Sequence, residues 1–180
     1  MNIEIFDNEV SFVDMQKIYN YVYNSNYRLG WDDTDHKKVP NIYSQFTKEE
    51  VDDCSLLKYF KSVSKKSKLK PNINNFERSV VNLSKCGDYN FNHTHENSIV
   101  LLYYVNLEWK DGFAGETLFY DDNLIDARFV SAFVPGRILI FDGDIPHTIR
   151  PQSTYGPDYR FTVSYFVKKN DWKNIHTNSQ

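Results

Sequence analysis

The chain has 180 residues, which suits one domain with a full hydrophobic core, and it carries a formal net charge of −3. No basic run is long enough to indicate nucleic-acid binding, no apolar run approaches transmembrane length, and the first residues lack the pattern of a signal peptide. Two cysteines, Cys54 and Cys86, are too few for a disulfide framework, so we expect reduced thiols and a cytoplasmic location.

The first part of the chain alternates between helical patterns and short apolar or polar stretches. Ile3–Phe6 is predicted to form a short strand. Apolar residues recur at helical spacing over Ser11–Asn24 and again from Thr47 to Lys66, and each of these segments opens with a capping-box pattern. The polar segment Gly30–Asn41 between them is predicted to be a loop. We therefore expect two amphipathic helices before residue 71.

From residue 76 onward, short apolar or alternating runs follow one another and are separated by turn residues. The predicted strands are Phe76–Leu83, His93–Asn106, Glu116–Tyr120, Ala127–Phe133, Arg137–Phe141, His147–Arg150 and Arg160–Val167. Strands at this spacing are typical of a sandwich or a jelly roll. Two helices followed by a series of strands predict an α+β fold, with the helices packed on one sheet.

Three of the five histidines have neighbours that indicate a metal site. His93 and His95 are two residues apart at the start of an apolar run, and the alternation of a strand would place both on one face. His147 follows a turn rich in Asp and Gly and opens another predicted strand. Imidazoles that converge from such positions can bind one metal ion. His36 and His176 lack such neighbours, and we predict packed or surface roles for them.

Arg160 begins the last predicted strand, R-F-T-V-S-Y-F, and shares one strand face with Thr162 and Ser164. An arginine that points into a barrel is a buried charge, which is costly without a partner. A carboxylate ligand would satisfy it through a bidentate pair. The alternative is an arginine at a strand end that reaches solvent.

These stretches together resemble the double-stranded β-helix (jelly-roll) core of the Fe(II)- and 2-oxoglutarate-dependent dioxygenases, and within them the prolyl 4-hydroxylase group. The resemblance covers residues 93 to 167 and rests on H-T-H, L-L-Y-Y-V-N-L-E-W, G-F-A-G-E-T-L-F-Y-D, V-P-G-R-I-L-I-F-D-G-D-I-P-H-T-I-R-P and Y-R-F-T-V-S-Y-F. It implies one domain over residues 1–180: mainly helical support in 1–75, the jelly-roll core in 76–168 and a tail in 169–180.

The resemblance also implies roles for individual residues. His93 matches the first iron ligand of the family, and His147 matches its distal histidine ligand. Arg160 matches the basic residue that binds the far carboxylate of 2-oxoglutarate, and Tyr104 matches the tyrosine whose hydroxyl supports the same carboxylate. Ser164 matches a small hydroxyl residue on the strand of the arginine.

One position departs from the family pattern. The second ligand of the family is the Asp or Glu of an H-x-D/E motif, whereas this chain has His95 there. Three interpretations are open: a three-histidine iron site, a carboxylate supplied by Glu96 through a bulge, or a site that has lost its activity. A regular strand turns Glu96 away from His93. Some dioxygenase-like sequences have H-x-H at this place, so the resemblance favours His95 as the ligand and an active enzyme.

The resemblance implies a dioxygenase that hydroxylates a peptidyl prolyl residue or a small molecule and releases succinate and carbon dioxide, with ascorbate as an auxiliary reductant. The alternative is a cupin-like metal-binding barrel without oxygenase activity, either an isomerase or a binding module. Arg160 together with Tyr104 favours the dioxygenase, because other barrels need no anchor for 2-oxoglutarate.

Several further segments are expected to surround the site. Substrate choice is expected to depend on Gly30–Gln45, Asp111–Gly115 and Asp121–Asp126, although these segments contain no specificity code. Trp109 and the segment Gly115–Thr117 match structural features of the group, and we predict packing and turn formation for them.

Overall fold

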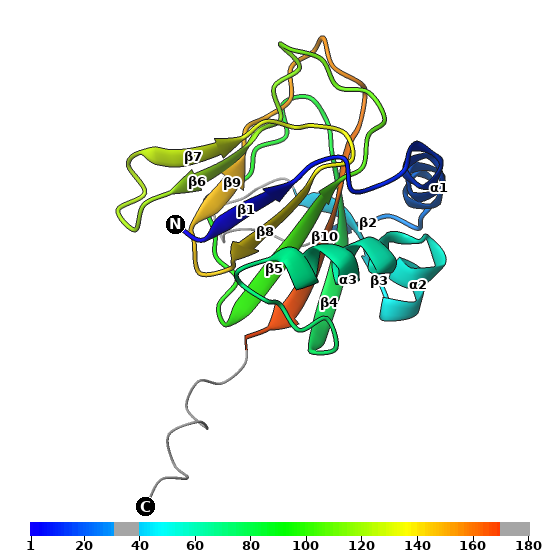
Figure 1. The fold of residues 1–180 in the computed structure, drawn as a ribbon. Helices are drawn as coiled ribbons and strands as arrows, with labels where there is room; N and C mark the ends of the chain where they lie inside the picture. Colours follow the sequence, from blue (N-terminus) through cyan, green and yellow to red (C-terminus); the bar gives the residue numbers. More distant parts are fainter. Residues whose placement is uncertain (31–39, 170–180) are drawn as a thin grey trace, which may run out of the picture.

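A computed structural model of the chain describes residues 1–30 and 40–169 as two antiparallel sheets with helices on one side (Figure 1). The larger sheet has the strand order β1-β8-β5-β10-β4-β3-β2, and the smaller one has the order β7-β6-β9. The helices are α1 (Phe12–Tyr23), α2 (Lys48–Asp53) and α3 (Leu56–Lys66). The strands are β1 (Ile3–Phe6), β2 (Arg28–Gly30), β3 (Asn41–Phe46), β4 (Phe76–Ser84), β5 (Ser98–Tyr104), β6 (Thr117–Tyr120), β7 (Ala127–Ser131), β8 (Ile138–Asp142), β9 (His147–Ile149) and β10 (Arg160–Lys168).

The predicted α+β architecture is confirmed, and the two capping residues do what their types predict. The Ser11 side chain accepts a hydrogen bond from the backbone N–H of Asp14 at the start of α1. At the start of α2, Thr47 and Glu50 form a complete reciprocal capping box. Such caps satisfy N–H groups that have no partner within the helix.

The predicted helix from Thr47 to Lys66 is wrong in one respect, because it is divided into α2 and α3. Ser55 lies between them with φ 75°, in the left-handed region, and its N–H bonds to the carbonyl of Asp52. This break changes the direction of the chain. Leu56 and Leu57, the first two residues of α3, are both buried.

The first 75 residues contribute strands as well as helices. β1 pairs with β8 at one edge of the larger sheet, as the sequence predicts for Ile3–Phe6. β2 and β3 form an antiparallel pair beside β4, and the sequence analysis did not predict them. Of the predicted loop Gly30–Asn41, residues 31–39 lie outside the described part of the chain, as does the tail from residue 170.

Alternation along the central strands divides the interior into two clusters. On β10, the side chains of Phe161, Val163 and Tyr165 join the cluster between the larger sheet and the helices. Phe166 joins the second cluster, which lies between the two sheets together with Phe119 of β6. The period-2 alternation of strands therefore assigns each central strand a helix-facing side and a barrel-facing side.

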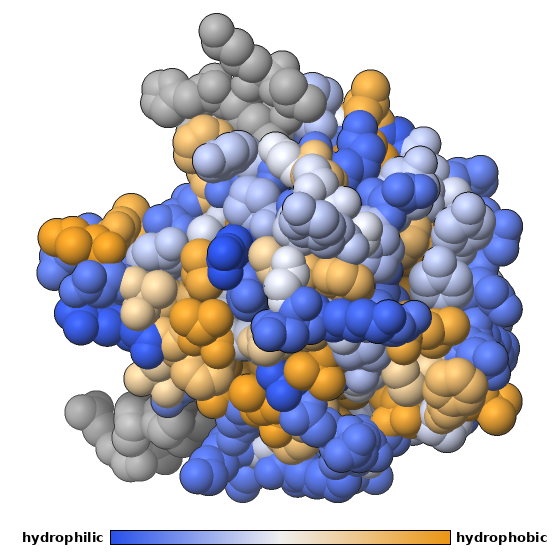
Figure 2. All heavy atoms as spheres, turned by 90° about the horizontal axis from the view of Figure 1, so that it is seen from above, coloured by the Kyte–Doolittle hydropathy of each residue, from blue (hydrophilic) through white to orange (hydrophobic). Residues whose placement is uncertain are grey.

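Large exposed hydrophobic side chains are spread over several elements rather than gathered in one place. They include Phe12 and Val13 on α1, Leu29 on β2, Ile125 in the β6–β7 connection and Tyr155 near β10. Seen from above, hydrophobic side chains form small groups between hydrophilic ones (Figure 2). Cys54 is buried and Cys86 is exposed, and both are free thiols. No helix in residues 1–30 or 40–169 is long and apolar enough to span a membrane.

Candidate metal centre

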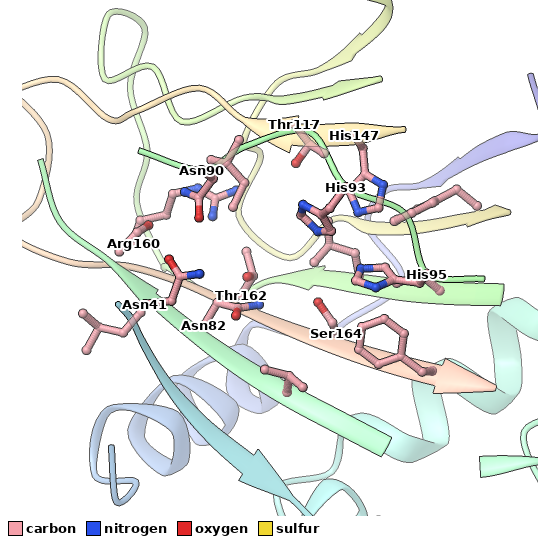
Figure 3. Close-up of a pocket in the computed structure, with 18 of the residues that line it drawn as sticks. Asn41, Asn82, Asn90, His93, His95, Thr117, His147, Arg160, Thr162 and Ser164 are labelled. Carbon is pink, nitrogen blue, oxygen red and sulfur yellow. The ribbon is translucent and has the colours of Figure 1, made fainter. Parts of the chain in front are cut away.

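The three predicted histidine ligands meet between the two sheets. Potential ligand atoms of His93, His95 and His147 all lie within 4.8 Å of one another. The ring centroids are separated by 4.5 Å for His93 and His147, by 4.9 Å for His93 and His95, and by 5.1 Å for His95 and His147. Figure 3 shows the three rings turned toward one another at one end of a pocket. This spacing is close enough for all three to hold a single ion.

Backbone pairing brings His93 and His147 together. Their peptide groups exchange two hydrogen bonds of 3.1 Å in an isolated antiparallel bridge at the start of β9. Each ring also donates from Nδ1 to the backbone carbonyl two residues earlier, that of Phe91 for His93 and that of Ile145 for His147. A carbonyl can only accept, so Nδ1 carries a proton and Nε2 is the ring nitrogen that remains to bind a metal.

The segment that carries His95 differs from the prediction. We expected one strand over His93–Asn106, but β5 begins only at Ser98, and a turn at residues 96–97 separates it from the histidines. Asn97 in this turn has φ 58°. The alternation of a regular strand therefore does not explain why the rings converge. Backbone hydrogen bonds to the connection between β8 and β9 hold this segment instead.

Gly143 in that connection fixes His95. The N–H of His95 donates to the Gly143 carbonyl at 2.7 Å, and the N–H of Gly143 donates to the carbonyl of Ser98 at 2.9 Å. A Cβ atom at Gly143 would lie 2.4 Å from the His95 carbonyl oxygen and 2.7 Å from that of Ser98. These distances are too short for a side chain at this position, so only glycine allows the close approach.

We expect Gly143→Ala to weaken iron binding at least tenfold, because the added methyl group must push the His95 backbone away from the other two histidines. Crowding of this kind costs about 1–3 kcal/mol of stability, so the domain should remain folded. The measurements are iron affinity and thermal unfolding. Gly156→Ala is the matched control, since its Cβ would meet its nearest atoms at 3.4–3.5 Å. Equal iron affinity in the two variants would contradict this role of Gly143.

Burial disfavours the charged form of two of the rings, those of His95 and His147. Burial lowers the pKa of His95 to about 2, helped by the nearby His147 and His93, and it lowers the pKa of His147 to about 3. Neutral imidazole is the form that binds metals. His95 also packs its ring edge-to-face against Phe166, at 4.7 Å between centroids.

Glu96, the alternative ligand, is exposed and lies in the turn before β5. Its carboxylate is not among the groups that could share an ion with His93 and His147 in the described chain. The geometry therefore favours a set of three imidazoles. Imidazole suits iron(II), and three facial ligands leave further positions free on an octahedral ion.

A pocket extends from the histidines along the barrel-facing side of β10 to Arg160 (Figure 3). Arg160 is 1% exposed, and burial lowers the pKa of its guanidinium to about 10, so it stays charged at neutral pH. Its Nε donates to the carbonyl of Gly115 at 3.0 Å, while Nη1 and Nη2 are buried without a partner. Two unpaired donors on a buried cation are costly unless a ligand accepts from them. This arrangement suits the carboxylate of a small acid.

Three aromatic rings and one glycine pack around the guanidinium of Arg160 and hold it in this position. Phe133 lies 4.9 Å from the Arg160 guanidinium carbon and stacks between the rings of Tyr104 and Trp109. Trp109 donates from its indole nitrogen to the carbonyl of residue 114, next to Gly115. Gly115 has φ 81°, and a Cβ there would come within 3.0 Å of Trp109 and 3.2 Å of Arg160. Trp109 therefore has the packing role that was predicted for it, and its packing also orients Arg160.

Of the two residues predicted to place a hydroxyl group near the ligand, Ser164 lines the pocket and Tyr104 does not. Ser164 lines it on the same strand face as Arg160. Tyr104 is fully buried behind the lining, and its hydroxyl is hydrogen-bonded to that of Thr117 at 2.7 Å. Thr117 does line the pocket, as does Thr162, whose buried Oγ1 has no partner. Sequence reasoning assigned no ligand role to these threonines, although Thr162 shares the face of Arg160.

Of the remaining predicted residues, one segment reaches the pocket in part, others do not line it, and two histidines are outside the described residues. His36 and His176 belong to the parts of the chain that the structure does not describe. In the predicted substrate segment Gly30–Gln45, Asn41 lines the pocket, at the start of β3. Residues 111–115 and 121–126 do not contribute to the pocket lining.

No family model matches the chain, and neither does any curated protein. Solved structures do match. A prolyl hydroxylase from Trichoplax adhaerens, in complex with a peptide fragment of the hypoxia inducible factor oxygen degradation domain, is 16% identical with a TM-score of 0.67, and the match covers 99% of this chain and 88% of that one. A prolyl-4-hydroxylase from Pseudomonas putida is 11% identical with a TM-score of 0.64, covering 94% and 93%.

An oxidoreductase of the 2OG-Fe(II) oxygenase family from Burkholderia pseudomallei is 9% identical with a TM-score of 0.69, and the match covers 94% of this chain and 86% of that one. At these identities the likeness concerns the fold. The chain has the fold of the 2-oxoglutarate- and Fe(II)-dependent oxygenases, prolyl hydroxylases among them, so the predicted double-stranded β-helix class is confirmed.

Proposed function

We propose that the protein is an Fe(II)- and 2-oxoglutarate-dependent dioxygenase that hydroxylates a peptidyl prolyl residue or a small molecule. One observation carries this proposal: a three-histidine cluster and a buried arginine with two unpaired Nη atoms share a single pocket. The fold of the neighbouring structures agrees with it.

His93, His95 and His147 would hold the iron, because each offers an imidazole nitrogen and the first and last are oriented by Nδ1 hydrogen bonds. Bound iron would supply dioxygen activation, with 2-oxoglutarate as the two-electron reductant that leaves as succinate and carbon dioxide. Ascorbate would act as an auxiliary reductant in the assay. The residues themselves position these groups within a pocket that combines polar and apolar side chains.

Arg160 would bind the far carboxylate of 2-oxoglutarate through its two free Nη atoms. Thr162 and Ser164 follow it along the same face of β10 and offer hydroxyl groups between the arginine and the histidines (Figure 3). Tyr104 would support this end indirectly, because its hydroxyl holds that of Thr117, which lines the pocket. A cupin-like barrel without oxygenase activity has no need for such an anchor, and this disfavours the alternative function.

A peptidyl prolyl substrate is supported by likeness alone, since one neighbouring prolyl hydroxylase was solved with a peptide fragment. The test is succinate release with iron(II), 2-oxoglutarate and ascorbate, against a panel of prolyl peptides and small molecules. Wild-type protein should release succinate, and Arg160→Ala should not. Binding of both iron and 2-oxoglutarate without any succinate release would contradict the proposed reaction.

Arg160→Lys should weaken 2-oxoglutarate binding about tenfold to a hundredfold while leaving iron affinity unchanged, since lysine keeps the charge but loses the bidentate fork. Arg160→Ala should weaken it further. Calorimetric titration of the metal-loaded protein measures both affinities. Unchanged 2-oxoglutarate affinity in Arg160→Ala would place the anchor elsewhere in the pocket.

A further inference from the structure

The ends of three neighbouring strands meet beside His95. In the larger sheet, β5 lies between β8 and β10 (Figure 1), and because both pairs are antiparallel, the start of β5 lies next to the ends of the other two strands. The register places Ser98 of β5 opposite Lys168 of β10. Asp142 ends β8, and Lys169 directly follows β10. Side chains from these strand ends can therefore act on the segment that carries His95.

Two carboxylates flank Gly143, the residue whose carbonyl accepts from the N–H of His95. Asp142 Oδ1 accepts from the N–H of Asp144 at 3.0 Å, which closes a turn around Gly143. Asp144 Oδ1 accepts from the N–H of Asn97 at 3.2 Å. The two carboxylates therefore connect the turn that contains Gly143 with the turn that follows His95.

Lys169 binds both carboxylates, and the three side chains form a charged cluster. Its Nζ lies 2.6 Å from Asp142 Oδ1 and 2.5 Å from Asp144 Oδ2. The side chains of Lys169 and Asp142 are 28% and 26% exposed, so this pair is largely shielded from water, which strengthens it relative to a fully exposed pair. Without the ammonium, two negative charges on one short turn would repel each other. Lys169 therefore stabilises the turn around Gly143.

The turn before β5 is held by the same charged cluster. Asn97 in this turn has φ 58°, a left-handed conformation that costs free energy unless neighbouring contacts support it. Both of its backbone polar groups are bound: its N–H donates to Asp144, and its carbonyl accepts from the N–H of Lys169 at 2.8 Å. Because Asn97 is only two residues after His95, this support also fixes the backbone of His95.

The ring of His95 is held differently from the rings of the other two histidines. His93 and His147 are bridged to each other by two backbone hydrogen bonds, and each ring donates from Nδ1 to a backbone carbonyl. Within residues 1–30 and 40–169, the ring of His95 makes no hydrogen bond and packs against Phe166 instead. Its position is therefore set by that packing and by the backbone that the charged cluster supports.

We propose that Lys169 is a positioning residue for the metal centre. By binding Asp142 and Asp144, it fixes the turn around Gly143 and the turn at residues 96–97. These two turns hold the backbone of His95 so that its ring faces the other two histidines. The role rests on the proposed function, since it takes the three histidines to share one ion, and Lys169 acts on that ion only through His95.

Lys169→Met removes the ammonium and keeps most of the length of the side chain. Because the two ion pairs that support the His95 backbone are lost, the full-length variant should bind iron(II) about threefold or more weakly than wild type in an anaerobic titration. Lys168→Met, at the exposed neighbouring position, is the matched control and should bind like wild type. Lys169→Arg should recover most of the affinity, since a guanidinium can pair with both carboxylates. Equal iron affinity in Lys169→Met and Lys168→Met overturns the proposal.

A double-mutant cycle with His95→Ala distinguishes positioning of this ligand from a general structural effect. Nickel(II) is the probe, because it binds imidazole more tightly than iron(II) does and can report on the two remaining histidines. Lys169→Met should weaken nickel(II) binding about threefold or more in the wild-type background and leave it unchanged in the His95→Ala background. An equal loss in both backgrounds means that Lys169 does not act through His95, and this overturns the proposal.

Titrations of the wild-type protein separate this proposal from the proposed function. If wild type binds neither iron(II) nor nickel(II), the metal centre is wrong, and the role of Lys169 is wrong with it. If wild type binds iron(II) and 2-oxoglutarate while Lys169→Met binds metal as the control does, the proposed function stands and only the positioning role is overturned.

Discussion

Replacing His147 with alanine should abolish iron binding while leaving the domain folded. His147 is the ligand that joins the two halves of the site, since it opens β9 in the smaller sheet and is bridged to His93 by two backbone hydrogen bonds. Those hydrogen bonds involve peptide groups, so the substitution removes the imidazole and leaves the bridge. Two remaining histidines cannot complete a facial set of three ligands.

The cost to stability should be modest. The ring of His147 packs against Phe141, at 4.9 Å between centroids, and against Phe119 at 5.8 Å, and it donates one hydrogen bond to the carbonyl of Ile145. Losing these contacts should cost about 2 kcal/mol, against about 5–15 kcal/mol for a typical domain. Circular dichroism should therefore report a folded protein.

Iron affinity and thermal unfolding are measured together in His147→Ala. Added imidazole provides a check, because it can occupy the vacated space and should restore part of the iron binding. Normal iron affinity in the folded variant would remove His147 from the ligand set. Loss of the fold would instead give the histidine a structural role.

The second large effect concerns whether His95 or Glu96 is the iron ligand. We expect His95→Ala to lose iron, because its ring belongs to the group of three whose ligand atoms lie within 4.8 Å. Glu96→Ala should bind iron like wild type, because this side chain is exposed in the turn before β5. The competing ligand set, with Glu96 in place of His95, predicts the opposite result for both variants.

His95→Asp extends the comparison. It restores the carboxylate that the dioxygenase family has at this place, so the variant should still bind iron, with some loss because aspartate is shorter than histidine. The carboxylate removes one unit of positive charge from the metal site, which should favour higher oxidation states of the ion. Iron titrations of the three variants decide the ligand set, and retained iron in His95→Ala with loss in Glu96→Ala would refute our choice.

Several features were predictable from the sequence because they depend on local patterns. Most strands from residue 76 onward were placed within a few residues, since short alternating runs between turn residues indicate strands wherever they occur. The caps at Ser11 and Thr47 follow from the residue types at helix starts. The candidate residues of the site could also be named from the sequence, because His93, His147 and Arg160 occur in an order and spacing that resemble a family pattern.

Other features required the tertiary structure. The strand β3 pairs with the edge of β4 and β2 pairs in turn with β3, while the residues of both strands give no strong strand signal. The break at Ser55 accompanies the burial of both Leu56 and Leu57 in the core that the helices share with the larger sheet. Such effects arise from contacts between segments that are distant in the sequence, and local propensity contains no information about them.

The sequence by itself determined which side chains could form the metal centre, because their chemistry and order are local facts. Only the tertiary structure decided how they meet. His95 joins His93 and His147 through backbone hydrogen bonds to Gly143, and not through the alternation of one strand. Packing likewise decided the surroundings of Arg160, because the sheets bury its guanidinium and leave both Nη atoms without a protein partner. A ligand would then be the partner that satisfies them.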